Sequence, residues 1–275
     1  MNKEYIFKRA DIDPLKTLFK YRDIQNEYHK KLLFNQELYF STLDFLNDPF
    51  EGALPLQHIS EITDEEIIEA NIKIIKYNNP NQVYTDEVLN ALRRDLNTTD
   101  VRKRYDSEEK IINMQRSVRL VNNAIGILSL SIDPINYLMW SHYADSHKGF
   151  CVGFNIFKLL KYLDMPYPVP ITYQEDIPCW KIMEPPIEYA KKYWATKGLL
   201  WEYEQEVRFL SRKYINKSLI FDIEIIDCVF LGYKMEACYV EEILKYFSNN
   251  HRSCNIYKVR FTPKLYDLEA EKVNY

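Results

Sequence analysis

Residues 201–209, Trp-Glu-Tyr-Glu-Gln-Glu-Val-Arg-Phe, alternate bulky apolar and charged side chains. A period of two is typical of a half-buried β-strand, because successive side chains point to opposite faces. The pattern predicts a strand on which Glu204, Glu206 and Arg208 follow one another along the charged face. Neighbouring carboxylates can perform acid–base chemistry or stabilise a cation where a pocket covers them. A solvated strand face is the alternative.

Glycine and cysteine content narrows the classes of site that the chain can build. It has 6 glycines in 275 residues, and neither a G-x-G-x-x-G nor a Walker motif occurs. Nucleotide folds that cradle phosphate on a glycine-rich loop are therefore disfavoured. The 5 cysteines are scattered without a C-x-x-C, which argues against a disulfide framework and against a cysteine-based zinc site.

Charge and hydropathy set the expected environment. The net charge of −4 does not predict a large nucleic-acid footprint. No apolar run approaches the length of a membrane span, and the first residues lack the apolar core of a signal peptide. We therefore expect a cytoplasmic protein without a membrane segment.

Hydrophobic periodicity predicts an α+β fold with a mixed, mainly antiparallel sheet in a single domain over residues 1–275. Residues 60–120 carry isoleucines at helical spacing and predict a helical insertion, which would act as a lid or as a surface for a partner protein. Helices are predicted at about 24–34, 136–145, 187–196 and 236–247. Strands are predicted at 38–42, 124–130, 150–154, 170–174, 201–209, 219–224, 226–232 and 255–262.

The segment Asn47-Asp48-Pro49-Phe50-Glu51 places two carboxylates on a tight turn. A structural interpretation has Asp48 closing an Asx-turn and Phe50 anchored in the core. The other interpretation has Asp48 or Glu51 facing a ligand.

Residues 139–150 concentrate aromatic and histidine side chains. Trp140 and Tyr143 are expected in the core, with His142 or His147 hydrogen-bonded nearby. A zinc site through these histidines and Asp48 or Glu51 requires the helix to stop between them, because residues five apart lie about 140° around a helix axis. Cys151, between Phe150 and Val152, is expected to be buried rather than to act as a nucleophile.

Several motifs together resemble a large bacterial family of unknown function. They are Tyr21-Arg22, Leu-Tyr-Phe-Ser at 38–41, Asn-Asp-Pro-Phe-Glu at 47–51, Met-Trp-Ser-His-Tyr-Ala through His-Lys-Gly-Phe at 139–150, and Trp-x-Tyr-Glu-x-Glu-x-Arg at 201–208. The resemblance spans most of the chain outside the helical insertion, and it implies no activity.

A second resemblance concerns chemistry. An arginine, a strand with Ser41-Thr42 and a later Glu-x-Glu are similar to the Arg–Ser–Glu pattern of ADP-ribosyltransferases. In that superfamily a split antiparallel sheet binds NAD without a glycine-rich loop. The resemblance implies that Glu206 stabilises an oxocarbenium-like ribose after nicotinamide leaves, and that Glu204 orients or deprotonates the acceptor.

The same resemblance implies the other site residues. Arg22, next to Tyr21, would hold an NAD phosphate, and Ser41 would brace the catalytic glutamate. Stacking or hydrogen bonding to nicotinamide would come from Trp140, Tyr143 or His142. The expected catalytic residues are Glu206, Glu204 and His142; the expected NAD-binding residues are Tyr21, Arg22, Ser41, Asp48, Trp140 and Tyr143.

These motifs leave three hypotheses for function. The first is an NAD-dependent mono-ADP-ribosyltransferase that modifies a protein or nucleic acid, as a toxin or phage-defence effector would. The second is a metal-dependent nuclease or hydrolase that uses Asp48, Glu51, His142 and Glu204. The third is an interaction module without enzymatic activity, in which the aromatic motifs serve only as core.

Overall fold

The chain divides into two compact units, which are described separately. The computed structural model describes residues 16–275 except 53–54, 58, 107–111, 114–115, 117–119, 121–122, 182–191, 252 and 264. The first unit contains the residues up to Thr42, Ile125–Ile171 and Leu200–Tyr275. The second contains Leu43–Ala124 and Thr172–Leu199, and the predicted insertion at 60–120 falls within it.

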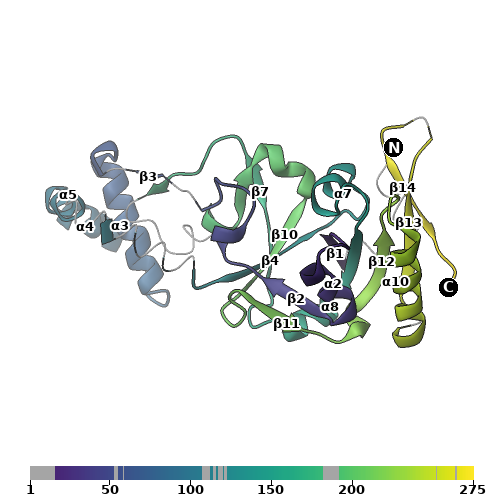
Figure 1. Ribbon diagram of the computed structural model, residues 1–275. Helices are drawn as coiled ribbons and strands as arrows, with labels where there is room; N and C mark the ends of the chain where they lie inside the picture. The colour runs from purple at the N-terminus through teal and green to yellow at the C-terminus, as the bar shows by residue number, and fades with distance from the viewer. Residues whose placement is uncertain are drawn as a thin grey trace. The chain divides into compact units, whose positions relative to one another are not determined.

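An eight-stranded sheet in the order β14–β13–β12–β5–β1–β4–β10–β6 forms the centre of the first unit (Figure 1). Its strands are β1 (Thr17–Arg22), β4 (Gly126–Ser131), β5 (Phe150–Asn155), β6 (Pro168–Pro170), β10 (Glu206–Ser211), β12 (Ile226–Leu231), β13 (Asn255–Phe261) and β14 (Leu268–Lys272). Neighbouring strands run antiparallel except for the parallel pair β12–β13. The predicted α+β class with a mixed, mainly antiparallel sheet is confirmed.

The sheet divides between β1 and β4. β1 pairs with β5 along its whole length, but it pairs with β4 only where Phe19 faces Ser131. Near the start of β4, Ile127 instead exchanges backbone hydrogen bonds with Ser41. Ser41 follows β2 (Glu37–Phe40), which pairs with β11 (Lys217–Ile220) in a separate two-stranded sheet. The β2–β11 strand pair is therefore joined to β4 where β4 is no longer paired with β1.

Three helices cover what we call the first face of the sheet. They are α2 (Glu27–Phe34), α8 (Ile156–Leu159) and α10 (Ala237–Asn250). Leu33, Leu159 and Phe247 from these helices pack in one core with sheet residues such as Leu130 and Phe209. The Asn26 side chain caps the start of α2 by accepting a hydrogen bond from the Tyr28 amide at 2.9 Å.

The opposite side, which we call the second face, is covered by the short helix α7 (Tyr137–Tyr143). Met139 and Trp140 from α7 pack with Phe19, Tyr21 and Phe230 from the sheet in a separate core. The Asn136 side chain starts the helix by accepting hydrogen bonds from the amides of the first turn. Because β5 is buried on both faces, its sequence is continuously apolar rather than alternating.

The second unit contains the helices α3 (Asp64–Asn78), α4 (Asp86–Asp95) and α5 (Thr98–Tyr105). A capping box between Thr63 and Glu66 starts α3, and Asn97 caps α5. Two parallel strand pairs join β3 (Leu56–Gln57) to β8 (Trp180–Lys181) and β7 (Thr172–Gln174) to β9 (Thr196–Gly198). Across both units, short 3-10 helices lie at Leu43–Phe45, Ile59–Glu61, Leu160–Tyr162, Leu199–Glu204 and Ile223–Ile225.

The structure corrects several local predictions. Phe50, expected as a core anchor, is 63% exposed. The strands β1 and β14 were not predicted. The helix predicted at 187–196 falls largely outside the described residues. All five cysteines are free, and Cys151 is buried as expected.

Candidate functional site

A buried ion pair at the start of β10 forms the centre of the candidate site. Glu206 is 6% exposed and Arg208 is fully buried. Because they are two apart on a strand, both side chains lie on one face. Arg208 Nε and Nη2 donate to the two carboxylate oxygens of Glu206 at 2.7 and 3.1 Å. This two-point geometry offsets much of the cost of taking both charges out of water.

The predicted strand at 201–209 is only half correct. Residues Leu199–Glu204 form a 3-10 helix, and β10 begins at Glu206. Between them Gln205 has a φ of +45°, which turns the chain. Glu204 therefore does not stand in line with Glu206 on one strand face. The predicted charged face is also not solvated, since Glu204 is 4% exposed.

Glu204 is held by groups from two other elements. The hydroxyl of Tyr143, at the end of α7, donates a short hydrogen bond to its carboxylate. The Ser131 hydroxyl donates to its main-chain oxygen at 2.7 Å. α7 thus fixes the Glu204 carboxylate, and the end of β4 fixes the Glu204 main chain.

Ser131, rather than Ser41, is the serine next to Glu206. Ser131 and Glu206 are direct partners between β4 and β10. Ser41 pairs with Ile127, four residues earlier in β4. Sequence reasoning missed Ser131, although Ser129 and Ser131 interrupt an otherwise apolar strand at a spacing of two, which indicates that one face of that strand is polar.

An aromatic cluster adjoins the two glutamates. The His142 ring centroid lies 5.9 Å from that of Tyr203, and the Tyr203 centroid lies 6.1 Å from that of Trp201. Asn136 ties this segment to the start of α7 by donating to the Tyr203 main-chain oxygen at 2.8 Å. His142 is exposed, so its ring is accessible at the edge of the site.

Tyr21 and Trp140 lie in the core beneath the site. Their ring centroids are 5.3 Å apart in an edge-on arrangement. The Tyr21 hydroxyl donates to the Asp133 main-chain oxygen at 2.5 Å, and Trp140 Nε1 donates to the Pro134 oxygen at 3.0 Å. Burial raises the pKa of Tyr21 well above its usual value. Both polar groups are engaged with backbone, which leaves their rings as packing surfaces.

Arg22 lies on the other face of the sheet from Glu206. In the β1–β5 pairing it stands opposite Phe150, whose side chain belongs to the first-face core. Glu206 and Phe19 both pair with Ser131, and Phe19 belongs to the second-face core. Burial lowers the pKa of Arg22 to about 10, so the guanidinium remains charged at neutral pH. The structure therefore does not bring Arg22 and Glu206 together.

Asp48 and Glu51 belong to the second unit. The Asp48 carboxylate accepts a hydrogen bond from the Phe50 amide at 2.9 Å, which is the Asx-turn that the sequence predicts. Glu51 forms an ion pair with Lys197 at 3.1 Å, and both side chains are almost fully buried. The four residues of the hydrolase hypothesis are thus divided between the two units, with His142 and Glu204 in the first.

His147 follows α7 in a strained turn. Asp145, Ser146 and His147 have φ values of +43°, +50° and +73°, which non-glycine residues rarely adopt. The His147 Nε2 lies 3.1 Å from the Ser141 hydroxyl, so the expected hydrogen bond of this histidine is present. Burial lowers its pKa, and the nearby Lys234 lowers it further.

No three His, Cys, Asp or Glu side chains in the described part of the chain approach one another as metal ligands would. No helix among those residues has the length and apolarity needed to cross a membrane.

Comparison with known proteins gives a family match over part of this site. No curated protein and no solved structure gives a significant match to the chain. Residues 139–209 match the family model described as a protein of unknown function (DUF2971). This segment carries Tyr143, Glu204 and Glu206 together with α7 and the start of β10. Over these residues the chain is similar to an uncharacterised family; the wider resemblance that includes the motifs at 21–22, 38–41 and 47–51 stays a prediction.

Proposed function

We propose that the protein is an NAD-dependent ADP-ribosyltransferase that modifies a macromolecule, with Glu206 as its central residue. The observation that carries the proposal is the burial of Glu206 at the start of β10, where Arg208 fixes its carboxylate and Ser131 is its direct partner. A carboxylate held in a water-poor site is suited to stabilising positive charge that develops on a sugar.

The proposed reaction breaks the bond between ribose C1′ and the nicotinamide nitrogen, and nicotinamide leaves with the electron pair. The ribose becomes oxocarbenium-like, and Glu206 would stabilise this charge and hold a ribose hydroxyl. A nucleophile of the acceptor then forms a bond to C1′ and gives its proton to Glu204. Tyr143 would orient Glu204 through their hydrogen bond.

Two roles implied by the resemblance change in this proposal. Ser131 replaces Ser41 as the serine that braces the glutamates, since its hydroxyl bonds the Glu204 main chain. Arg22 has no role at the centre because its strand pairing directs it to the first face. His142 and Tyr203 form an aromatic surface that could receive the nicotinamide ring, and Tyr203 precedes Glu204 in the chain. A toxin or phage-defence role stays a prediction.

The test is NAD turnover, measured as nicotinamide release with and without a lysate as acceptor. We expect Glu206→Gln to lower the rate roughly 100-fold or more, the usual effect of losing a preorganised stabilising group. Glu202→Gln is the matched control, because Glu202 is exposed on the adjacent 3-10 helix and should leave the rate unchanged.

Circular dichroism and NAD binding of each variant distinguish a lost catalytic group from lost folding. If Glu206→Gln does not fold, Glu204→Gln is measured in its place with the same expectation. Wild-type turnover in a folded Glu206→Gln protein overturns the role of Glu206. Absence of both NAD binding and NAD turnover in the wild-type protein overturns the proposed function.

A further inference from the structure

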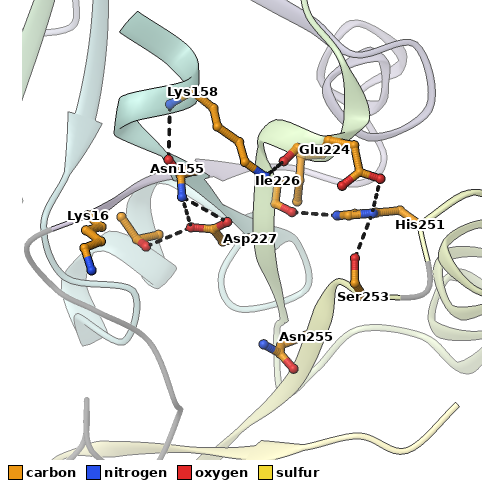
Figure 2. Close-up of a pocket in the computed structure, with 10 residues that line it drawn as sticks. Lys16, Asn155, Lys158, Glu224, Ile226, Asp227, His251, Ser253 and Asn255 are labelled. Carbon is orange, nitrogen blue, oxygen red and sulfur yellow. Dashed lines mark hydrogen bonds and ion pairs between the residues drawn. The ribbon is translucent and has the colours of Figure 1, made fainter.

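A polar pocket lies at one end of the first unit's sheet, where β1 and β13 begin, β5 ends and β12 starts (Figure 2). Its volume is about 280 Å³, and none of the residues discussed for NAD lines it. Since a water molecule takes about 30 Å³, the pocket has room for a small metabolite. The lining residues used below are Asn155, Lys158, Glu224, Asp227, His251 and Asn255.

Asp227 is fixed in this pocket with acceptor capacity to spare. The β5–β12 register shifts between Ile226 and Cys228, so that Asp227 sits at a β-bulge, a feature that redirects a side chain. Its carboxylate accepts hydrogen bonds from Thr17 Oγ1 at 3.3 Å and Asn155 Nδ2 at 3.2 Å (Figure 2). An ionised carboxylate offers about four acceptor sites, so further donors can be bound.

His251 forms one wall of the pocket, and the residue is 7% exposed. Its Nε2 lies 2.9 Å from the Ile226 oxygen, and its Nδ1 lies 3.2 Å from the Glu224 carboxylate. Lys158 Nζ donates to the Glu224 main-chain oxygen at 2.6 Å, which ties α8 to the same wall. These groups are already engaged with protein atoms, so the wall sets the shape of the pocket.

Asn255 is available to a ligand. Its side-chain amide forms no hydrogen bond with any described residue, and Figure 2 shows it joined to none of the residues drawn. An amide both donates and accepts hydrogen bonds. Asn255 and Asp227 together therefore present one donor group and several acceptor sites to the pocket.

The chemistry of the lining favours a neutral ligand. The two lysines in the lining are matched by Glu224 and Asp227, so the pocket does not concentrate charge of either sign. Among the described residues that line it, His251 carries the only aromatic ring, so these residues offer little surface for stacking a nucleobase. Hydroxyl groups suit a carboxylate and an amide equally well, since a hydroxyl donates and accepts.

We infer that this pocket binds a small neutral polyhydroxylated molecule of pentose or hexose size, with adjacent hydroxyls donating to Asp227 and one hydroxyl paired with Asn255. The inference does not rest on the proposed function. Its failure and the failure of NAD turnover are separate results, because the two sites share no residue named here.

The test is ligand-observed NMR on the full chain, with D-ribose, D-glucose and myo-inositol as probes and with inorganic phosphate and glycine betaine as charged comparators. We expect at least one polyol to bind with a dissociation constant in the millimolar range. Asn255→Ala should weaken binding about tenfold, the effect of one lost hydrogen bond. The side chain bonds no described residue, so folding should be preserved.

The matched control is Asn249→Ala, which removes an exposed asparagine of α10 and should leave binding unchanged. Asp227→Asn is the second variant, and it should weaken binding at least as much as Asn255→Ala. The inference is overturned if no polyol binds at about 50 mM, since useful recognition is tighter than that. Unchanged binding in Asn255→Ala, or tighter binding of phosphate or betaine, also overturns it.

Discussion

Replacing Ser131 by alanine tests whether the end of β4 holds the candidate site together. The Ser131 hydroxyl donates to the Glu204 main-chain oxygen at 2.7 Å and accepts from the Asp133 amide at 3.2 Å. The side chain is 2% exposed, so water cannot replace these bonds without local opening. One hydroxyl therefore joins β4, the loop that follows it and the residue two before Glu206.

The expected cost follows from these two bonds. A typical buried hydrogen bond contributes about 1 kcal/mol net, and a buried partner that loses its bond costs about 1–3 kcal/mol. We expect Ser131→Ala to lower the free energy of unfolding by about 2–4 kcal/mol. NAD turnover should fall as well, because the Glu204 main chain loses its anchor to β4.

Urea unfolding followed by circular dichroism measures this change, provided that the slope with denaturant is unchanged. Ser129→Ala is the matched control on the same strand face. The Ser129 side chain forms no hydrogen bond with any described residue, so its loss should cost less than about 0.5 kcal/mol. Equal effects of the two substitutions would refute the reasoning.

Three further predictions concern stability. Glu51→Ala should lower the free energy of unfolding by about 3–5 kcal/mol, because it leaves the buried Lys197 ammonium without this carboxylate. The control is Glu271→Ala, which breaks an exposed ion pair with Arg260 and should cost under about 1 kcal/mol. Similar costs for the two substitutions would contradict the argument from burial. Burial lowers the pKa of His29 to about 4, below its value near 6.5 in the unfolded chain, so stability should fall as pH drops from about 6.5 toward 4. At pH 5 the loss of stability is at most about 2 kcal/mol, and partial exposure of the ring reduces it. If His29→Gln leaves the slope of stability with pH unchanged, His29 is not the source of the loss. Gly232→Ala should destabilise the protein by about 1–3 kcal/mol in thermal or urea unfolding, since a Cβ there would lie 2.2 Å from the His147 oxygen. If the Gly232→Ala protein is as stable as the wild type, the neighbouring turn can move to make room.

Local signals in the sequence predicted much of the sheet. Strands β5 and β12 are short apolar runs, and buried strands of this kind can be read without knowledge of their partners. Helix starts also depend on local residues, since the Asn97 side chain accepts a hydrogen bond from the Asp100 amide in the first turn of α5. These features depend on residues close together in the chain.

The geometry of the site depended on pairing between distant strands. Successive residues of a strand point to opposite faces of the sheet, so Tyr21 and its neighbour Arg22 lie on different faces. The left-handed Gln205 ended an alternation that otherwise continues from 201 to 209. The partner of Glu206 could be known only from the β4–β10 register, in which Ser131 takes the place expected of Ser41.

The turn at Asp145–His147 bears on the order in which the protein folds. Its left-handed residues each cost of order 1–3 kcal/mol, so an isolated fragment would not adopt the turn. The Lys234 amide donates to the His147 oxygen at 3.1 Å, and the Gly232 amide donates to the Gly149 oxygen at 2.9 Å. These partners are more than 80 residues away, and closing such a loop is entropically costly. We expect this corner to form late, after β12 has docked beside β5.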